Sequence, residues 1–201
     1  MACLCIGPIS SGKTMLLKRL QGAEIDESTS TVETVGSNIV QIAKVAPSGN
    51  NGESKKSGTM SAKEEEKNYV GLREVGGSMS PLWPSYYNPY KPIIYVIDSS
   101  NLFQVSIATV HLMEILSHEK LVRCRVLIVL AKTDLTDAKK LNLLKFMMRL
   151  DNIITQAGKR VSLLEASSVT GDGINEIRKW IVDNVAFAAR LSQIEKDMVK
   201  L

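Results

Sequence analysis

The chain has 201 residues and a net charge of +4, with 44% hydrophobic and 23% charged residues. These values are ordinary for a globular protein with one buried core and some additions. The basic residues are spread along the chain, which argues against nucleic-acid binding. No apolar run approaches the roughly 18 residues of a membrane span, and no signal peptide precedes the first predicted strand. We expect a cytoplasmic protein that partners can recruit to membranes.

The first predicted element is a strand over residues 2–7, and a complete phosphate-loop motif follows it directly. Residues 7–14 read Gly-Pro-Ile-Ser-Ser-Gly-Lys-Thr, and the next apolar residues have helical spacing over 13–21. In this motif, backbone N–H groups and the helix N-terminus surround a polyphosphate, the lysine reaches the β- and γ-phosphates, and the threonine binds Mg²⁺. We therefore assign phosphate and Mg²⁺ binding to Gly7, Ser10, Ser11, Gly12, Lys13 and Thr14.

Strand-like and helix-like segments alternate in the rest of the chain. Strands are predicted over 38–46, 68–74, 92–98, 124–130 and 160–166, and helices over 102–118, 137–156 and 173–198. Two of the strands, 92–98 and 124–130, are almost wholly apolar, which is typical of strands buried on both faces. The pattern predicts an α/β fold with a mostly parallel six-stranded sheet and helices on both faces. Ligands in such sheets bind at the carboxyl ends of the strands.

Two segments depart from this alternation. Residues 47–67 contain four lysines, four glutamates and almost nothing to bury, so we expect a disordered loop between two strands. Near the C-terminus a narrow apolar stripe recurs at helical spacing. Its members are Phe187, Leu191, Ile194, Met198 and Leu201. Packing of this stripe on its own domain is favoured over docking to another protein.

Several sequence pieces resemble an Arf-like small GTPase over roughly residues 2–190. They are Thr31-Val-Glu-Thr34-Val-Gly-Ser-Asn38, Glu74-Val-Gly-Gly77 followed by Pro81-Leu-Trp83-Pro-Ser-Tyr86-Tyr87, Ala131-Lys132-Thr133-Asp134, and Ser167-Ser168 shortly before Gly171-Asp172-Gly173. The Val-Gly-Gly and Pro-Leu-Trp-x-x-Tyr-Tyr pieces distinguish the Arf branch from Ras and Rab relatives. The resemblance implies a P-loop small-GTPase fold that binds GTP or GDP with Mg²⁺.

The resemblance also assigns roles to the matching residues. Thr34 is the first-switch threonine that binds Mg²⁺ and the γ-phosphate, and the N–H of Gly77 meets the γ-phosphate in the second switch. Release of both switch segments after hydrolysis gives the order-to-disorder transition of the superfamily. Asp134 is expected to accept two hydrogen bonds from the guanine edge, and the alkyl stem of Lys132 to cover the base. Ser167 and Ser168 complete the nucleotide site.

Four substitutions fall at working positions of the family pattern. Ala131 replaces an asparagine that binds the base and braces the phosphate loop, whereas Ser168 replaces an alanine that acts through its backbone. Glu74 replaces the aspartate that holds a water of the Mg²⁺, which keeps the carboxylate but moves it by one methylene. Ser78 replaces the glutamine that orients the attacking water, and its hydroxyl is too short to reach the same place. We therefore expect slow hydrolysis.

The ends of the chain also differ from the family pattern. Ala2 stands where Arf proteins have a myristoylated glycine, and the chain ends without a prenylation box, so we expect no direct lipid anchor. We divide the chain into a GTPase domain over 1–190 and a helical extension over 191–201. We expect a monomer whose effectors and regulators bind through the switch segments.

Three functions are compatible with these patterns. The leading one is a GTP-binding switch that recruits protein effectors in membrane or ciliary traffic. The alternative is a pseudo-GTPase scaffold with constitutive nucleotide or none, which Ala131 and Ser78 favour. A phosphate-loop kinase is the third, but the arginine-rich lid that it requires is missing from the sequence.

Overall fold

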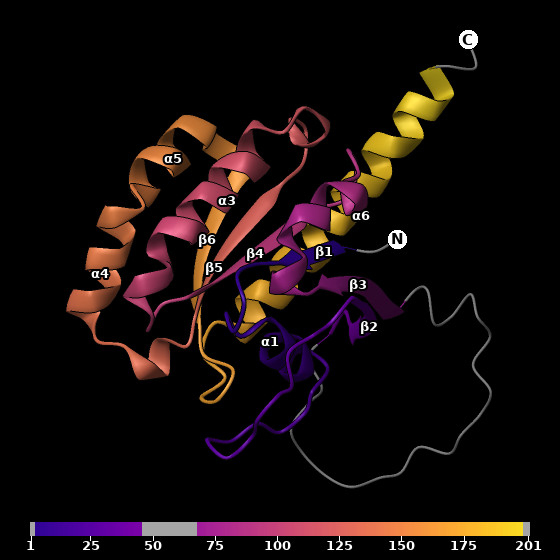
Figure 1. Ribbon diagram of the computed structural model, residues 1–201. Helices are drawn as coiled ribbons and strands as arrows, with labels where there is room; N and C mark the ends of the chain where they lie inside the picture. Colours follow the sequence, from indigo (N-terminus) through magenta and orange to yellow (C-terminus); the bar gives the residue numbers. More distant parts are fainter. Residues whose placement is uncertain (1–2, 46–67, 199–201) are drawn as a thin grey trace, which may run out of the picture.

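The computed structural model describes residues 3–45 and 68–198. Six strands form one sheet in the order β2-β3-β1-β4-β5-β6 (Figure 1). Their bounds are β1 Cys3–Ile6, β2 Ser37–Ala43, β3 Tyr69–Val75, β4 Ile93–Asp98, β5 Val126–Ala131 and β6 Val161–Ala166. β2 pairs antiparallel with β3, and the other neighbours are parallel. The predicted, mostly parallel six-stranded sheet is confirmed, while the predicted loop over 47–67 lies outside the described residues.

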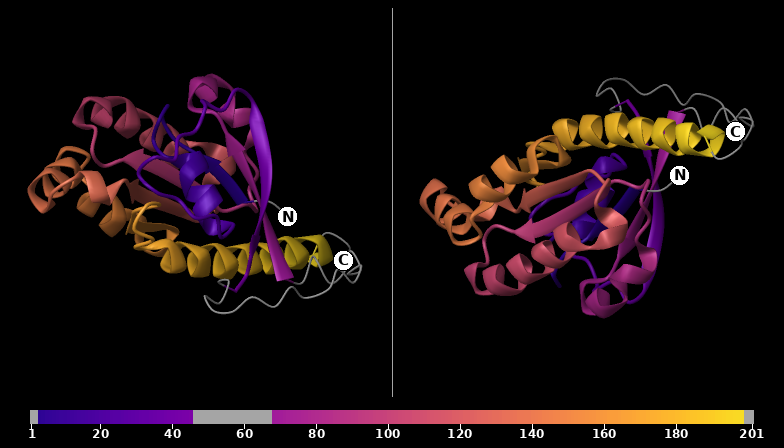
Figure 2. Two further views of the ribbon diagram at one scale, coloured as in Figure 1. Left: turned by 90° about the horizontal axis from the view of Figure 1, so that it is seen from below. Right: turned by 90° about the horizontal axis from the view of Figure 1, so that it is seen from above.

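Helices cover both faces of this sheet (Figures 1 and 2). One face carries α1 (Lys13–Leu20) and α6 (Ile174–Met198), and the other carries α3 (Val105–Ser117), α4 (Ala138–Met147) and α5 (Leu150–Ala157). Short 3₁₀ segments join them at Gly77–Tyr86, Leu102–Gln104, Glu119–Leu121, Thr133–Leu135 and Gly158–Arg160. None of the described helices is both long and apolar enough to cross a membrane.

The two buried clusters follow from the alternation of side chains along each strand. In β1, Leu4 and Ile6 face the cluster under α3, whereas Cys3 and Cys5 face the cluster under α1 and α6. Every residue of β4 and β5 is buried, as the apolar runs predicted. The centre of the sheet is therefore packed on both faces, and its carboxyl edge can hold a site in place.

The single helix predicted over 137–156 is wrong, because α4 and α5 are separate. Arg149 between them has φ 52° and ψ 40°, a left-handed conformation that ends a helix. Met148 and Leu150 are both buried on either side of it. In one continuous helix these two side chains would point about 200° apart, so they could not both enter the core. The break is the local change that buries both.

The C-terminal helix α6 is anchored by a buried arginine and packs by part of its stripe. Arg178 donates to the carbonyl oxygen of Leu20 at 2.5 Å and to that of Ala43 at 2.6 Å. Of the predicted stripe, Phe187 and Leu191 border a small cavity shared with Arg125, whose guanidinium lies 5.0 Å from the Phe187 ring. The later members, Ile194 and Met198, are exposed, and Leu201 lies outside the described residues. Phe187 is still 39% exposed, so the predicted packing on the domain holds only in part, at Phe187 and Leu191.

Candidate functional site

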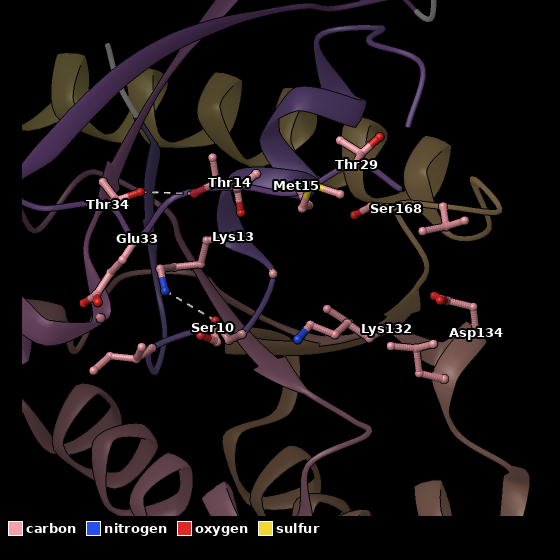
Figure 3. A pocket seen from close by; sticks show the side chains of 18 of the residues that line it. Ser10, Lys13, Thr14, Met15, Thr29, Glu33, Thr34, Lys132, Asp134 and Ser168 are labelled. Carbon is pink, nitrogen blue, oxygen red and sulfur yellow. Dashed lines mark hydrogen bonds between the residues drawn. The ribbon is translucent and has the colours of Figure 1, made fainter. Parts of the chain in front are cut away.

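A cavity of about 550 Å³ opens at the carboxyl edge of the sheet (Figure 3). Its size suits a ligand as large as a nucleotide. Most of the predicted site residues line it, namely Ser10, Ser11, Gly12, Lys13, Thr14, Thr34, Glu74, Gly77, Lys132, Asp134 and Ser168. Gly7, Ser78 and Ser167 are not among the lining residues. The structure therefore brings together segments that are up to 158 positions apart, from Ser10 to Ser168.

The phosphate loop holds its lysine at one side of the cavity. Lys13 is only 5% exposed, and its Nζ donates to the carbonyl oxygens of Gly7 at 2.9 Å and Pro8 at 2.8 Å. Burial lowers the pKa of Lys13, so an anion placed beside the ammonium would be strongly favoured. Gly7 supports the loop from behind, because a Cβ there would lie 2.1 Å from the carbonyl oxygen of Val96.

Three oxygen-bearing side chains converge beside the lysine. The hydroxyls of Thr14 and Thr34 are 3.1 Å apart, and Oε1 of Glu74 accepts from them at 2.5 Å and 3.3 Å respectively. The pairing of β3 with β1 places Glu74 opposite Cys5, next to the loop. Hydroxyl and carboxylate oxygens are the ligands that Mg²⁺ prefers. The donor set therefore fits the Mg²⁺ that the sequence predicts, with Glu74 long enough to reach both threonines.

The two predicted switch segments lie against each other and against the phosphate loop. A Cβ at Gly76 would lie 2.0 Å from the carbonyl oxygen of Thr34, and one at Gly77 would lie 2.4 Å from the amide nitrogen of Ile9. Only glycine permits these approaches at both positions. The buried Trp83 stabilises this arrangement by donating its Nε1 hydrogen to the Gly76 carbonyl oxygen at 3.2 Å. Ser78 comes next but is exposed and outside the cavity lining.

At the other end of the cavity, Lys132 bridges two loops. Its backbone is left-handed at φ 62°, and its Nζ lies 2.6 Å from Oδ2 of Asp98. A Cβ built on Gly12 would lie 3.7 Å from Cε of Lys132, so the alkyl stem runs over the phosphate loop. Asp98 is 6% exposed and also accepts from the amide and hydroxyl of Ser100. The lysine is therefore fixed by an ion pair rather than free in solvent.

Asp134 is oriented by a buried serine. The hydroxyl of Ser167 donates to Oδ1 of Asp134, and it accepts from the amides of Val169 at 3.2 Å and Thr170 at 3.1 Å. Ser167 thus orients Asp134 and the turn after β6, and it does not itself line the cavity. Asp134 and Ser168 face the cavity directly (Figure 3).

Sequence reasoning missed four acidic residues at the site: Asp26, Glu27 and Glu33, which line the cavity, and Asp98, which pairs with Lys132. Glu33 lines the cavity beside Thr34 and raises the pKa of Lys13, against the larger effect of burial. It has no signal in the sequence beyond its place next to a motif residue. Asp98 does have one, because it is the polar residue that ends an apolar strand, where parallel sheets place their ligands.

Replacing Ala131 by asparagine is expected to tighten binding of a fluorescent GDP analogue by about 5- to 150-fold, equivalent to roughly 1–3 kcal/mol of recovered hydrogen bonding. Ala131 is buried, and a Cβ built on Gly12 would lie 3.7 Å from its Cβ, so a longer side chain there reaches the phosphate loop. Ala131→Ser is the matched control, because serine is polar but lacks the side-chain amide of asparagine. Equal or weaker binding by the asparagine variant, at an unchanged melting temperature, would contradict this account.

Comparison with known proteins agrees with this geometry. The sequence profile of the ADP-ribosylation factor family matches residues 58–185. Human ADP-ribosylation factor-like protein 16 is 30% identical over 186 residues, which cover 89% of this chain and 83% of that protein. ADP-ribosylation factor-like protein 1 of Saccharomyces cerevisiae is 28% identical over 182 residues, covering 90% and 85%.

A solved structure shows the same fold. It is that of the Arl6 BBS3 small GTPase from Trypanosoma brucei with the bound nucleotide analogue GppNp, with a TM-score of 0.63 and 19% identity. The match covers 94% of this chain and 99% of that one. The predicted small-GTPase fold is confirmed.

Proposed function

Because the chain belongs to the ADP-ribosylation factor family, we propose that it is a GTP-binding molecular switch that recruits protein effectors in membrane or ciliary traffic. Its cofactors are GTP or GDP with Mg²⁺. The observation that carries the proposal is the convergence of Thr34 and Gly77 on the phosphate loop. These are the two segments whose contacts a γ-phosphate can make or release.

Each residue around the cavity has a distinct task in this proposal. Lys13 supplies a partly desolvated positive charge for the terminal phosphates. Thr14, Thr34 and Glu74 provide the oxygens that hold Mg²⁺, directly or through water. Bound Mg²⁺ neutralises phosphate charge. Lys132 and Asp134 bind the base, and Ser167 keeps Asp134 in position.

Exposed apolar side chains near the site support effector binding. Val32 and Val35 flank Thr34, Ile39 lies on β2, and Leu82 lies in the turn after Gly77. All four are exposed large hydrophobic residues, and apolar surface of this kind marks interaction sites. A change of the switch segments would move them together. We take residues 1–190 as the GTPase domain, 191–201 as its helical extension, and the protein as a cytoplasmic monomer.

Intrinsic hydrolysis is slow in this proposal, because Ser78 cannot align the attacking water. Single-turnover hydrolysis without a partner should fall at or below the roughly 10⁻⁴ per second of unassisted small GTPases. Ser78→Gln should raise this rate several-fold, measured as phosphate release at saturating GTP and Mg²⁺. Ser80→Gln, in the same segment, is the control and should leave the rate unchanged. Fast hydrolysis by the native chain would mean that another residue orients the water, and no response to Ser78→Gln would make the metal geometry limiting.

A pseudo-GTPase scaffold is the second candidate, and the replacement of two family side chains by Ala131 and Ser78 favours it. The nucleotide that co-purifies with the protein separates the two functions. Denaturation followed by chromatography should release intact GTP from a slow switch and GDP from an active one. A protein that carries no nucleotide and binds none on addition would be a scaffold, and the switch proposal would then be wrong.

A further inference from the structure

The outward face of α4 combines exposed apolar and basic side chains. Phe146 is 79% exposed, Met147 49% and Leu143 46%, although the helix has only ten residues. Lys139 and Lys140 are exposed beside them, and Arg149 is exposed just after the helix. We call Lys139, Lys140, Leu143, Phe146, Met147 and Arg149 the α4 surface. Exposed apolar groups concentrated in this way indicate an interaction site.

Helical spacing explains why these side chains share a face. Lys139, Leu143 and Phe146 are four and three residues apart, so they lie one above another along the helix. Leu144 and Met148 point the other way and are fully buried in the core. The core contact is therefore complete without the outward apolar residues, which leaves them available to a partner.

Basic side chains lie close together in the same segment. Residues 137–151 contain the four basic residues Lys139, Lys140, Lys145 and Arg149, with one acidic residue at each end, Asp137 and Asp151. Lys145 is paired with Glu165 at 2.6 Å. The other three make no ion pair with any residue in the described ranges 3–45 and 68–198. Their charged groups are therefore exposed to solvent and not engaged in an ion pair there.

We propose that the α4 surface docks the protein directly onto a membrane that contains anionic lipids. Apolar side chains flanked by lysine and arginine match the two layers of such a surface, acyl chains below and phosphate groups above. The long lysine side chains can reach the phosphates while Phe146 enters the boundary layer. A protein partner of acidic character would match the charges, but it would not require three large apolar groups beside them.

The position of α4 is consistent with this docking. In both figures α4 lies on the side of the molecule away from β2 and β3 (Figures 1 and 2). A membrane that contacts α4 would leave Val35 and Ile39, next to and on β2, free for effectors. Docking of this kind would need no covalently attached lipid.

The test is co-sedimentation of the full chain with vesicles of phosphatidylcholine, with and without phosphatidylserine. We expect binding only when phosphatidylserine is present, weakening as salt rises. Each basic residue near such a surface contributes about fivefold, so Lys139→Ala combined with Lys140→Ala should weaken binding by about 30-fold. Phe146→Ser should weaken it by about tenfold.

Matched controls separate this surface from general charge and hydrophobicity. Lys179→Ala combined with Lys196→Ala removes the same charge from exposed positions of α6, and Phe103→Ser removes a fully exposed phenylalanine elsewhere. Both controls should bind vesicles like the native chain, and GDP or a GTP analogue should give the same result because α4 is outside the switch segments. Equal losses in the controls would overturn the proposal. So would a lack of vesicle binding, which would leave an acidic protein as the partner of α4.

Discussion

Replacing Lys13 by alanine is expected to lower the affinity for a non-hydrolysable GTP analogue by at least about 100-fold. Each hydrogen bond from a charged group contributes about 1.5–3 kcal/mol, and the ammonium faces more than one phosphate oxygen in a partly dry pocket. The side chain is already held in place by the carbonyls of Gly7 and Pro8, so little ordering is lost on binding. Calorimetric titration measures the effect.

The matched control for this change is Lys18→Ala. Lys18 is on the same helix but exposed, so its loss should leave the affinity within about twofold, as for most surface substitutions. The melting temperature of both variants should be measured without nucleotide, because Lys13→Ala also removes hydrogen bonds within the phosphate loop. Unchanged binding by a folded Lys13→Ala variant would place the phosphates elsewhere and refute the assignment of the cavity.

Asp134→Ala should abolish the preference for GTP over ATP. The carboxylate is the group expected to accept two hydrogen bonds from the guanine edge, and adenine offers no matching pair of donors. A site built on such bonds discriminates strongly, because the wrong base leaves a polar group unpaired. Competition of GTP and ATP against a fluorescent GDP analogue measures the preference before and after the change.

Ser167→Ala provides a graded comparison for the base site. It keeps the carboxylate of Asp134 but removes the hydroxyl that donates to Oδ1. The preference for GTP should therefore fall in the same direction by a smaller factor, about tenfold, close to the roughly 1–1.5 kcal/mol of one hydrogen bond. Equal competition by ATP against the native chain would show that the Ala131–Asp134 segment does not bind guanine.

The phosphate site was predictable because its residues are contiguous. The eight residues from Gly7 to Thr14 carry their own turn, helix start and charge, so local physics determines their arrangement. The buried strands β4 and β5 were predictable for a similar reason, since a short unbroken apolar run is typical of a strand covered on both faces. Thr34 and Gly77 were found through family resemblance, and the contacts that join them to the loop came only from the structure.

The remaining features depend on contacts between distant segments. Lys132 and Asp98 are 34 residues apart, and no local sequence pattern predicts their ion pair. The reach of Glu74 to both threonines depends on how β3 pairs with β1. The break at Arg149 follows from the depth at which Met148 and Leu150 enter the core. The basic surface on α4 could not be predicted, because the sequence does not show which lysines are exposed on the same face of the fold.

Because Arg178 comes late in the chain, some hydrogen bonds of the first half of the fold can form only late in synthesis. Its guanidinium occupies the carbonyl oxygens of Leu20 and Ala43, which lie 158 and 135 positions earlier. Until residue 178 leaves the ribosome, those two oxygens can only be satisfied by water or by temporary partners. The last carbonyl groups of α1 and β2 therefore reach their final hydrogen bonds only when α6 packs against them. A nascent chain that ends at Gly173 already contains every nucleotide motif, but it still lacks the arginine that links α1 and β2 to α6.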